Sequence, residues 1–164
     1  MDLPDFNSAP AEEVTPALLA CCDVPSWATA VRDNRPYADL GALLATADAA
    51  ARQFTRADVD RALAAHPRIG ERAVGNGAEA AWSREEQSAV EQDAAVQRAL
   101  AEGNRAYEDR FDRVFLICAT GRSGEEVLAS LRSRLGNDEA TEAGVVADEL
   151  RRIALLRLRR VVGA

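Results

Sequence analysis

The sequence contains no lysine, and its 20 basic side chains are all arginines. Without a lysine the chain cannot form a Schiff base with a carbonyl substrate or anchor pyridoxal phosphate in the usual way. Acidic residues outnumber basic ones, which gives a formal net charge of −7. Because nucleic acids and anionic membranes attract basic surfaces, we expect neither as a partner. Any anionic ligand must be held by arginines placed close to it.

Histidine and cysteine are also scarce. His66 is the only histidine, and the cysteines at positions 21, 22 and 118 form no CxxC pair. Zinc sites need several such ligands together, so we expect no metal. The cysteine pattern fits a reduced, intracellular protein, and Met1–Phe6 is acidic where a secretory signal would be basic. The ending Val-Val-Gly-Ala is not a peroxisomal signal, so we expect a cytoplasmic location.

Aromatic residues make up only 5% of the chain, and no apolar run approaches the roughly 20 residues of a membrane span. The 164 residues are 48% hydrophobic, enough for one ordinary core, so we expect a single domain over residues 1–164. Alanine dominates the apolar set and β-branched residues are scattered, which favours an all-α helical bundle. Only Phe115–Cys118 resembles a strand, and one short strand makes no sheet.

Helix signals recur along the first half of the chain. Ser8 stands in the position of a helix start, and a short stretch bounded by Pro25 and Pro36 follows. Asp39–Phe54 is rich in alanine and leucine and is predicted to be helical. Thr55 and Asp58 form a capping pair, and the apolar spacing after them predicts a helix that continues to His66, before Pro67.

Two S-x-x-E patterns, beginning at Ser83 and Ser123, predict helix starts in the second half. The segment 68–81 before the first pattern holds three glycines and is predicted to be a long loop of functional interest. Gly103 marks a point where the helix after Ser83 can divide into two. The last helix is predicted over Glu139–Val162.

His66 is the only side chain whose ordinary pKa lies near neutrality. At the end of a helix it can simply hydrogen-bond the last carbonyl groups, or it can serve as a proton donor. Glu86 has a similar double interpretation. Its carboxylate can cap the helix expected to start at Ser83, or the positive end of that helix can keep it ionised to orient a polar substrate. A proton donor and an anion at opposite kinds of helix end would form a complementary acid/base pair.

Arg157 falls on an apolar face of the last predicted helix, at spacings of three or four from residues of one stripe: Val146, Leu150, Ile153 and Val161. An unpaired buried guanidinium is costly, so this arginine needs a partner. The partner is either a structural carboxylate or a substrate oxygen. Three nearby arginines are expected to face solvent: Arg151, Arg152 and Arg159.

Taken together, these residues resemble the OHCU decarboxylase family, where OHCU is 2-oxo-4-hydroxy-4-carboxy-5-ureidoimidazoline. The resemblance covers nearly the whole chain in order. It is carried by His66-Pro67-Arg68-Ile69-Gly70, Trp82-Ser83 with Glu86-Gln87, Asn104 with Tyr107, Arg110-Phe111, Phe115-Leu116-Ile117-Cys118, Gly121-Arg122-Ser123, and Glu149-Leu150 with Ile153 and Arg157-Leu158. Two stretches of the first half, Pro25-Ser26-Trp27 and Arg35-Pro36-Tyr37, also match.

The resemblance implies an all-α bundle, often a homodimer, that needs neither metal nor organic cofactor. It implies release of CO2 from OHCU to give (S)-allantoin in urate breakdown. His66 and Glu86 would be catalytic, with His66 as the acid, while Glu86 and Gln87 would bind and polarise the substrate. The substrate would be bound by Pro67, Ser83, Arg84, Glu85, Glu86, Gln87, Ile117, Cys118, Ala119, Thr120, Gly121 and Arg157. One departure is visible, because relatives commonly have glycine where this chain has Asp112.

Losing CO2 leaves an electron pair on a ring carbon, which the substrate's own carbonyl or imine can delocalise. The protein then needs only to orient the substrate, exclude water and deliver a proton to one face. Two other hypotheses remain open at this point: a helical interaction module without catalysis, and a related activity on another ureido or purine-derived ring acid.

Overall fold

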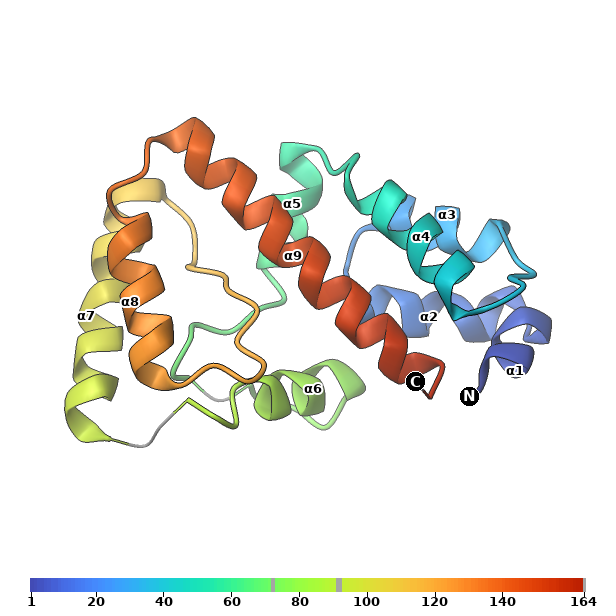
Figure 1. Cartoon of the computed structure of the whole chain (residues 1–164), viewed down its shortest axis with the longest axis horizontal. Helices are drawn as coiled ribbons and strands as arrows, with labels where there is room; N and C mark the ends of the chain where they lie inside the picture. The colour runs from blue at the N-terminus through green and yellow to red at the C-terminus, as the bar shows by residue number, and fades with distance from the viewer. Residues whose placement is uncertain (72, 91–92, 164) are drawn as a thin grey trace. The chain divides into compact units, whose positions relative to one another are not determined.

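A computed structural model describes residues 1–71, 73–90 and 93–163 (Figure 1). The described residues form nine α-helices and no strand, which confirms the all-α prediction. They fall into two compact units, Met1–Ala62 together with the chain from Leu150 onwards, and Leu63–Glu149. The single domain over residues 1–164 stays a prediction. No described helix combines the length and apolar character needed to cross a membrane.

The first unit is built from short helices that pack around buried aromatic and aliphatic side chains. Its helices are α1 (Leu3–Ser8), α2 (Ala11–Cys21), α3 (Pro25–Asp33), α4 (Leu40–Ala51) and most of α5 (Arg56–Leu63). Helix α3 packs against both α2 and α4 (Figure 1). Trp27 of α3 is buried and donates its indole N–H to the Ala47 carbonyl oxygen of α4 at 3.0 Å. The core therefore forms where neighbouring helices along the chain meet.

The predicted helix over Asp39–Phe54 is confirmed as α4, and the Asp39 side chain accepts a hydrogen bond from the Ala42 N–H. The Thr55 and Asp58 pair also caps α5 as expected. The prediction that Ser8 starts a helix is wrong. Ser8 is the last residue of α1, where its hydroxyl donates to the Pro4 carbonyl oxygen instead of receiving a backbone N–H.

The second unit contains α6 (Ala78–Glu86), α7 (Ala94–Phe111), α8 (Gly124–Arg134) and the first part of α9 (Glu139–Val161). Helices α7 and α8 lie side by side (Figure 1). Their facing sides share one buried cluster with the adjoining loops: Ile69, Val90, Leu100, Tyr107, Phe111, Phe115, Ile117, Ala119, Val127, Leu128 and Leu131. The strand-like residues 115–118 are part of the connection between α7 and α8 and contribute to this core.

The two S-x-x-E predictions have opposite outcomes. Ser123 and Glu126 form a complete capping box at the start of α8. Ser83 and Glu86, in contrast, lie in the last turn of α6, which already begins at Ala78 within the predicted loop. The next helix, α7, is capped by the Asp93 side chain, which accepts from the N–H groups of Ala95 and Val96. Gly103 does not divide α7, which is continuous through it.

The last helix, α9, has the limits expected from the sequence to within one residue. The predicted apolar stripe is buried along its whole length, from Val146 to Val161, with Arg157 among its members. Arg152 and Arg159 are exposed as expected. Arg151 differs from the expectation, because its side chain is only 17% exposed and pairs with Asp48 of the same unit.

Candidate active site

His66 lies just beyond the end of α5. The helix stops at Leu63, and a turn follows in which the His66 N–H donates to the Leu63 carbonyl oxygen at 3.0 Å. The helix ends three residues earlier than predicted, although the histidine does follow a helix end as expected. The Nε2 atom of the ring is buried. Pro67 cannot donate a backbone hydrogen bond, which keeps the helix from continuing.

His66 faces a hollow, called here the His66 hollow, with a volume of about 270 Å³. Its walls include His66, Pro67 and Ser83, together with Val74 and Glu79. Three residues predicted to belong to one site are therefore brought together. His66 comes from the turn that follows α5, and Ser83 comes from the last turn of α6.

The segment His66–Gly70 is tied to two helices of the second unit. The Arg68 guanidinium pairs with the Glu108 carboxylate of α7 through two contacts, at 2.5 and 3.1 Å. The Ile69 carbonyl oxygen accepts a hydrogen bond from the Asn104 amide of α7 at 2.9 Å. The Gly70 N–H donates to Gln87 Oε1, just after α6, at 3.0 Å. These contacts hold the chain on the carboxyl side of His66.

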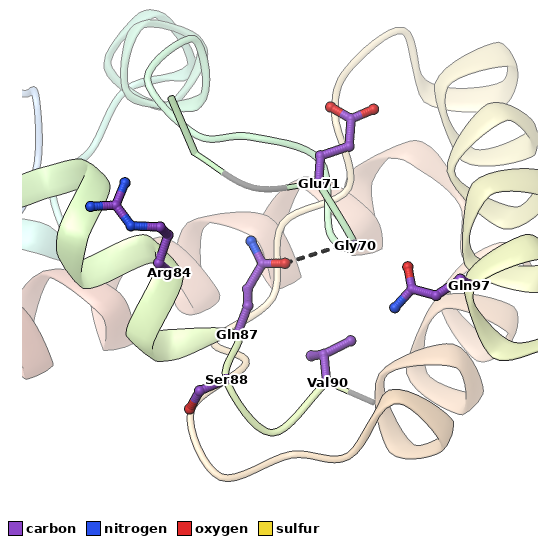
Figure 2. A pocket seen from close by; sticks show the side chains of 7 residues that line it. All are labelled: Gly70, Glu71, Arg84, Gln87, Ser88, Val90 and Gln97. Carbon is purple, nitrogen blue, oxygen red and sulfur yellow. Dashed lines mark hydrogen bonds between the residues drawn. The ribbon is translucent and has the colours of Figure 1, made fainter. Parts of the chain in front are cut away.

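A second hollow, called here the Gln87 hollow, has a volume of about 250 Å³ and is lined mainly by polar side chains (Figure 2). Gln87 and Arg84, both predicted to bind substrate, belong to its walls, with Gln97 of α7. Arg84 also donates to the carbonyl oxygens of Ala73 and Gly75, at 3.2 and 3.1 Å. It therefore holds the preceding loop as well as lining the hollow.

Glu86 occupies the last residue of α6 and is only 7% exposed. The predicted stabilisation by the positive end of a helix is therefore wrong, because the carboxylate lies at the negative end. Glu86 is three residues from Ser83 on the same helix, so the two side chains are neighbours on one face. The neighbouring predicted residue, Glu85, is exposed.

The predicted loop residues 117–121 follow the buried connection between α7 and α8. Ile117 and Ala119 are buried, whereas Thr120 and Gly121 are exposed. The Cys118 N–H donates to the buried carboxylate of Glu149 at 2.7 Å. Burial raises the pKa of the Cys118 thiol, and the carboxylates of Glu149 and Glu86 raise it further. The effect of Glu86 on the Cys118 thiol links two parts of the predicted site, the end of α6 and the loop of residues 117–121.

Arg157 belongs to the first unit and is only 1% exposed. Its Nη1 atom donates to the Ala20 carbonyl oxygen at 3.5 Å. Nearby, burial raises the pKa of the Cys22 thiol to about 12, an effect that the positive charge of Arg157 opposes. The expected burial of this guanidinium is confirmed. Its contact with the substrate stays a prediction.

Sequence reasoning gave no role to several polar residues that shape the site, notably Asn104, Glu108 and Glu149. Asn104 is 4% exposed and lies on the apolar face of α7, four residues after Leu100 and three before Tyr107. The pattern that singled out Arg157, a polar residue within an apolar stripe, would also have found Asn104. Glu108 gave no such signal, because it lies off that stripe.

Among the described residues, no three histidine, cysteine or carboxylate side chains are grouped so that they could hold a metal ion. The predicted site residues are polar side chains and loop segments of an all-α protein. The family model for OHCU decarboxylase matches residues 7–159 of this sequence. The chain belongs to the OHCU decarboxylase family.

Relatives of known name agree with this assignment. The chain is 31% identical to a 2-oxo-4-hydroxy-4-carboxy-5-ureidoimidazoline decarboxylase of Amia calva, over 99% of this chain and 95% of that protein. It is 30% identical to a uric acid degradation bifunctional protein of Arabidopsis thaliana, over 86% of this chain but 45% of that longer protein. A crystal structure of OHCU decarboxylase in the presence of (S)-allantoin matches with a TM-score of 0.76 at 26% identity, covering 95% of this chain and all of that one.

Proposed function

We propose that this chain is a carboxy-lyase that converts OHCU to (S)-allantoin in urate breakdown. The observation that carries the proposal is the His66 hollow, which is lined by both the only histidine and Ser83. The chain that forms it is a member of the OHCU decarboxylase family. A relative of similar fold was crystallised in the presence of (S)-allantoin, the proposed product. The sequence similarity extends over 95% of a decarboxylase of nearly the same length.

The proposed reaction breaks the bond between the ring carbon and the carboxylate carbon. The bonding electron pair stays on the ring, where the adjacent carbonyl or imine delocalises it, and CO2 leaves. A proton then adds to the neighbouring ring carbon, which carries the ureido group, while the hydroxyl group loses its proton and its carbon becomes the ring carbonyl. Because the substrate supplies its own electron sink, this route requires neither a metal nor an organic cofactor. The protein contributes orientation, exclusion of water and the proton.

His66 is the proposed donor of that proton, delivered to one face of the ring so that the S configuration results. Glu86 and Gln87 orient the hydroxyl and ureido groups of the substrate. Arg157 stabilises negative charge as it develops on an oxygen. Pro67, Ser83 and the backbone of residues 117–121 complete the proposed contact surface.

Two further properties are proposed, the first from the cysteine pattern and the second from the family resemblance. We propose a cytoplasmic location and a homodimeric state for the chain. Light scattering on the purified protein measures its mass directly, and a monomer at working concentration would contradict the second property.

We expect His66→Asn to lower kcat by about 10² to 10⁴-fold, the usual contribution of a general acid, while the fold is retained. The measurement uses freshly generated OHCU, follows the loss of its absorbance and records the optical activity of the allantoin formed. Asp60→Asn, at an exposed position of α5, is the control and should keep wild-type turnover.

The outcomes separate the hypotheses clearly. Catalysed decay with optically active allantoin from the wild-type chain supports the proposed enzyme. Decay at the uncatalysed rate would favour a binding module, and faster turnover of another ureido ring acid would change the substrate. Near-normal turnover by His66→Asn would refute the role of this histidine alone.

A further inference from the structure

One peptide unit in the site is held at both ends by side chains from different elements. The carbonyl oxygen of Ile69 accepts from Asn104 Nδ2 at 2.9 Å. The N–H of the same peptide unit, which belongs to Gly70, donates to Gln87 Oε1 at 3.0 Å. The Ile69–Gly70 peptide therefore forms a bridge between the middle of α7 and the residue that follows α6.

This bridge has a consequence for the chemistry that Gln87 can offer. A glutamine amide has one oxygen that accepts and one NH2 group that donates. The Gly70 N–H engages the oxygen, so the orientation of the amide is set. Figure 2 shows Gln87 with its oxygen directed to Gly70 and its nitrogen on the other side. Gln87 is thereby prepared to donate to an acceptor oxygen of a ligand.

The hydrogen bond from Asn104 is the contact best placed to fix the plane of the Ile69–Gly70 peptide. Asn104 is 4% exposed, and its bond to Ile69 is shielded from water. The ion pair between Arg68 and Glu108 also holds the segment, but its side chains are 47% and 25% exposed, and exposed ion pairs contribute little. The Ile69 side chain is packed in the core, but packing alone does not fix the direction of its carbonyl group.

We propose that Asn104 is a positioning residue, which holds the Ile69–Gly70 peptide so that Gln87 presents its amide N–H groups to an acceptor oxygen of the substrate. The proposal rests on the proposed function and extends it. Asn104 acts through the peptide bridge and does not itself touch the substrate. The acceptor is the oxygen of the ureido carbonyl or of the hydroxyl group, because groups with only N–H donors cannot use the nitrogen that Gln87 offers.

A double-mutant cycle tests this mechanism on the whole chain with OHCU as the substrate. Asn104→Leu should lower kcat/KM by about tenfold, the effect of losing one hydrogen bond in the transition state. In a Gln87→Leu background, the same change should lower kcat/KM by less than about twofold, because residues that act through one another are not additive. Equal losses in both backgrounds would overturn the proposal.

Leu100→Val is the control for a general loss of stability. Leu100 lies one turn before Asn104 on the same face of α7 and is 1% exposed. The substitution lowers the melting temperature without touching the bridge, so kcat/KM at a temperature where the protein is folded should stay within about twofold of wild type. A tenfold loss in this control would show that packing, not the bridge, sets the rate.

Two further outcomes are also decisive. If Asn104→Leu does not fold, Asn104→Ser replaces it in the same cycle, since the smaller side chain leaves room for water. If the wild-type chain itself does not accelerate the decay of OHCU, the proposed function and this inference both fall. If the wild type is active and the cycle is additive, only the role of Asn104 falls.

Discussion

At the scale of single residues, Asp112 shows what a departure from a family pattern means physically. It ends α7 in a left-handed conformation, with φ 53° and ψ 40°, and its N–H donates to the Glu108 carbonyl oxygen at 2.8 Å. Residues with a Cβ atom pay about 1–2 kcal/mol for this conformation, and aspartate less than most. Glycine adopts it freely, which gives a physical reason for the glycine that the family resemblance implies at this position.

We therefore expect Asp112→Gly to stabilise the protein. The strain that is relieved exceeds the extra chain entropy that glycine loses, so the free energy of unfolding should rise by about 0.5 kcal/mol. Asp109→Gly, three residues earlier in the exposed interior of α7, should have the opposite sign because no strain is relieved there. Urea unfolding of both variants measures the difference, and a loss of stability in Asp112→Gly would contradict the explanation.

Individual site residues differ in how far the sequence could predict them. The burial of Arg157 followed from its place in an apolar stripe, and the structure confirms it. Glu86 was noticed through a capping pattern that does not operate, and nothing in that pattern predicted its burial at the end of α6. Glu149 could not be assigned a role, because its bond to the Cys118 N–H joins residues 31 positions apart.

At the scale of elements, local signals succeeded where short-range hydrogen bonds decide the outcome. The capping box at Ser123 works because residue 122 and its neighbours do not continue a helix into it. The same pattern at Ser83 fails because the preceding alanine-rich residues already form α6, and a helix interior has no free N–H groups to cap. The two S-x-x-E patterns are therefore distinguished by the residues that precede them and not by the pattern itself.

Gly103 illustrates an element-scale effect that sequence alone could not reveal. A Cβ atom placed on Gly103 would lie 2.4 Å from Leu131 Cδ2 of α8, and Leu131 is completely buried. The glycine therefore permits the close approach of α7 and α8 and does not break α7. The pattern of one helix contains no information about the side chains of the helix packed against it.

We expect Gly103→Ala to destabilise the second unit. Alanine would favour an exposed helix by about 1 kcal/mol over glycine, but overpacking a buried contact costs about 1–3 kcal/mol. The packing cost should win, and the free energy of unfolding should fall. Gly144→Ala in α9 is the matched control, since nothing lies within 4 Å of its added Cβ, and it should stabilise the chain. Two stabilised variants would refute the close-packing role.

At the scale of the whole molecule, composition was enough to predict an all-α protein, because many alanines and few β-branched clusters leave no sheet to build. The family resemblance was recognisable because its motifs are spread over the chain in order, from the first unit to α9. The contacts that bring those motifs together in space could not be predicted from the sequence. They include the contact between Ile69 and Asn104, which are 35 residues apart.

A buried polar network joins the elements of the second unit. The Glu142 carboxylate of α9 is fully buried and accepts from Arg134 of α8 at 2.6 Å, from the Tyr107 hydroxyl of α7 at 2.6 Å and from Asn137 at 3.0 Å. Arg134 also donates to the Leu116 carbonyl oxygen at 2.7 Å. Burial alone would raise the pKa of Glu142, but these hydrogen bonds hold the pKa below its ordinary value. Burial, with a further contribution from the Glu142 carboxylate, raises the pKa of Tyr107 to about 12.

The depressed pKa of Glu142 predicts a direction for acid unfolding. The folded state binds this proton less readily than the unfolded state, so the stabilisation is complete above the ordinary carboxyl pKa and is lost as pH falls through the lower, folded value. Glu142→Gln should remove this part of the pH dependence. It should also lower stability at neutral pH by about 3–5 kcal/mol, because the buried Arg134 loses its carboxylate.

Glu71→Gln, which affects only an exposed pair with Arg68, should change stability by less than about 1 kcal/mol. Urea unfolding across the acid range measures both quantities. An unchanged slope in Glu142→Gln would mean that other carboxylates govern acid unfolding.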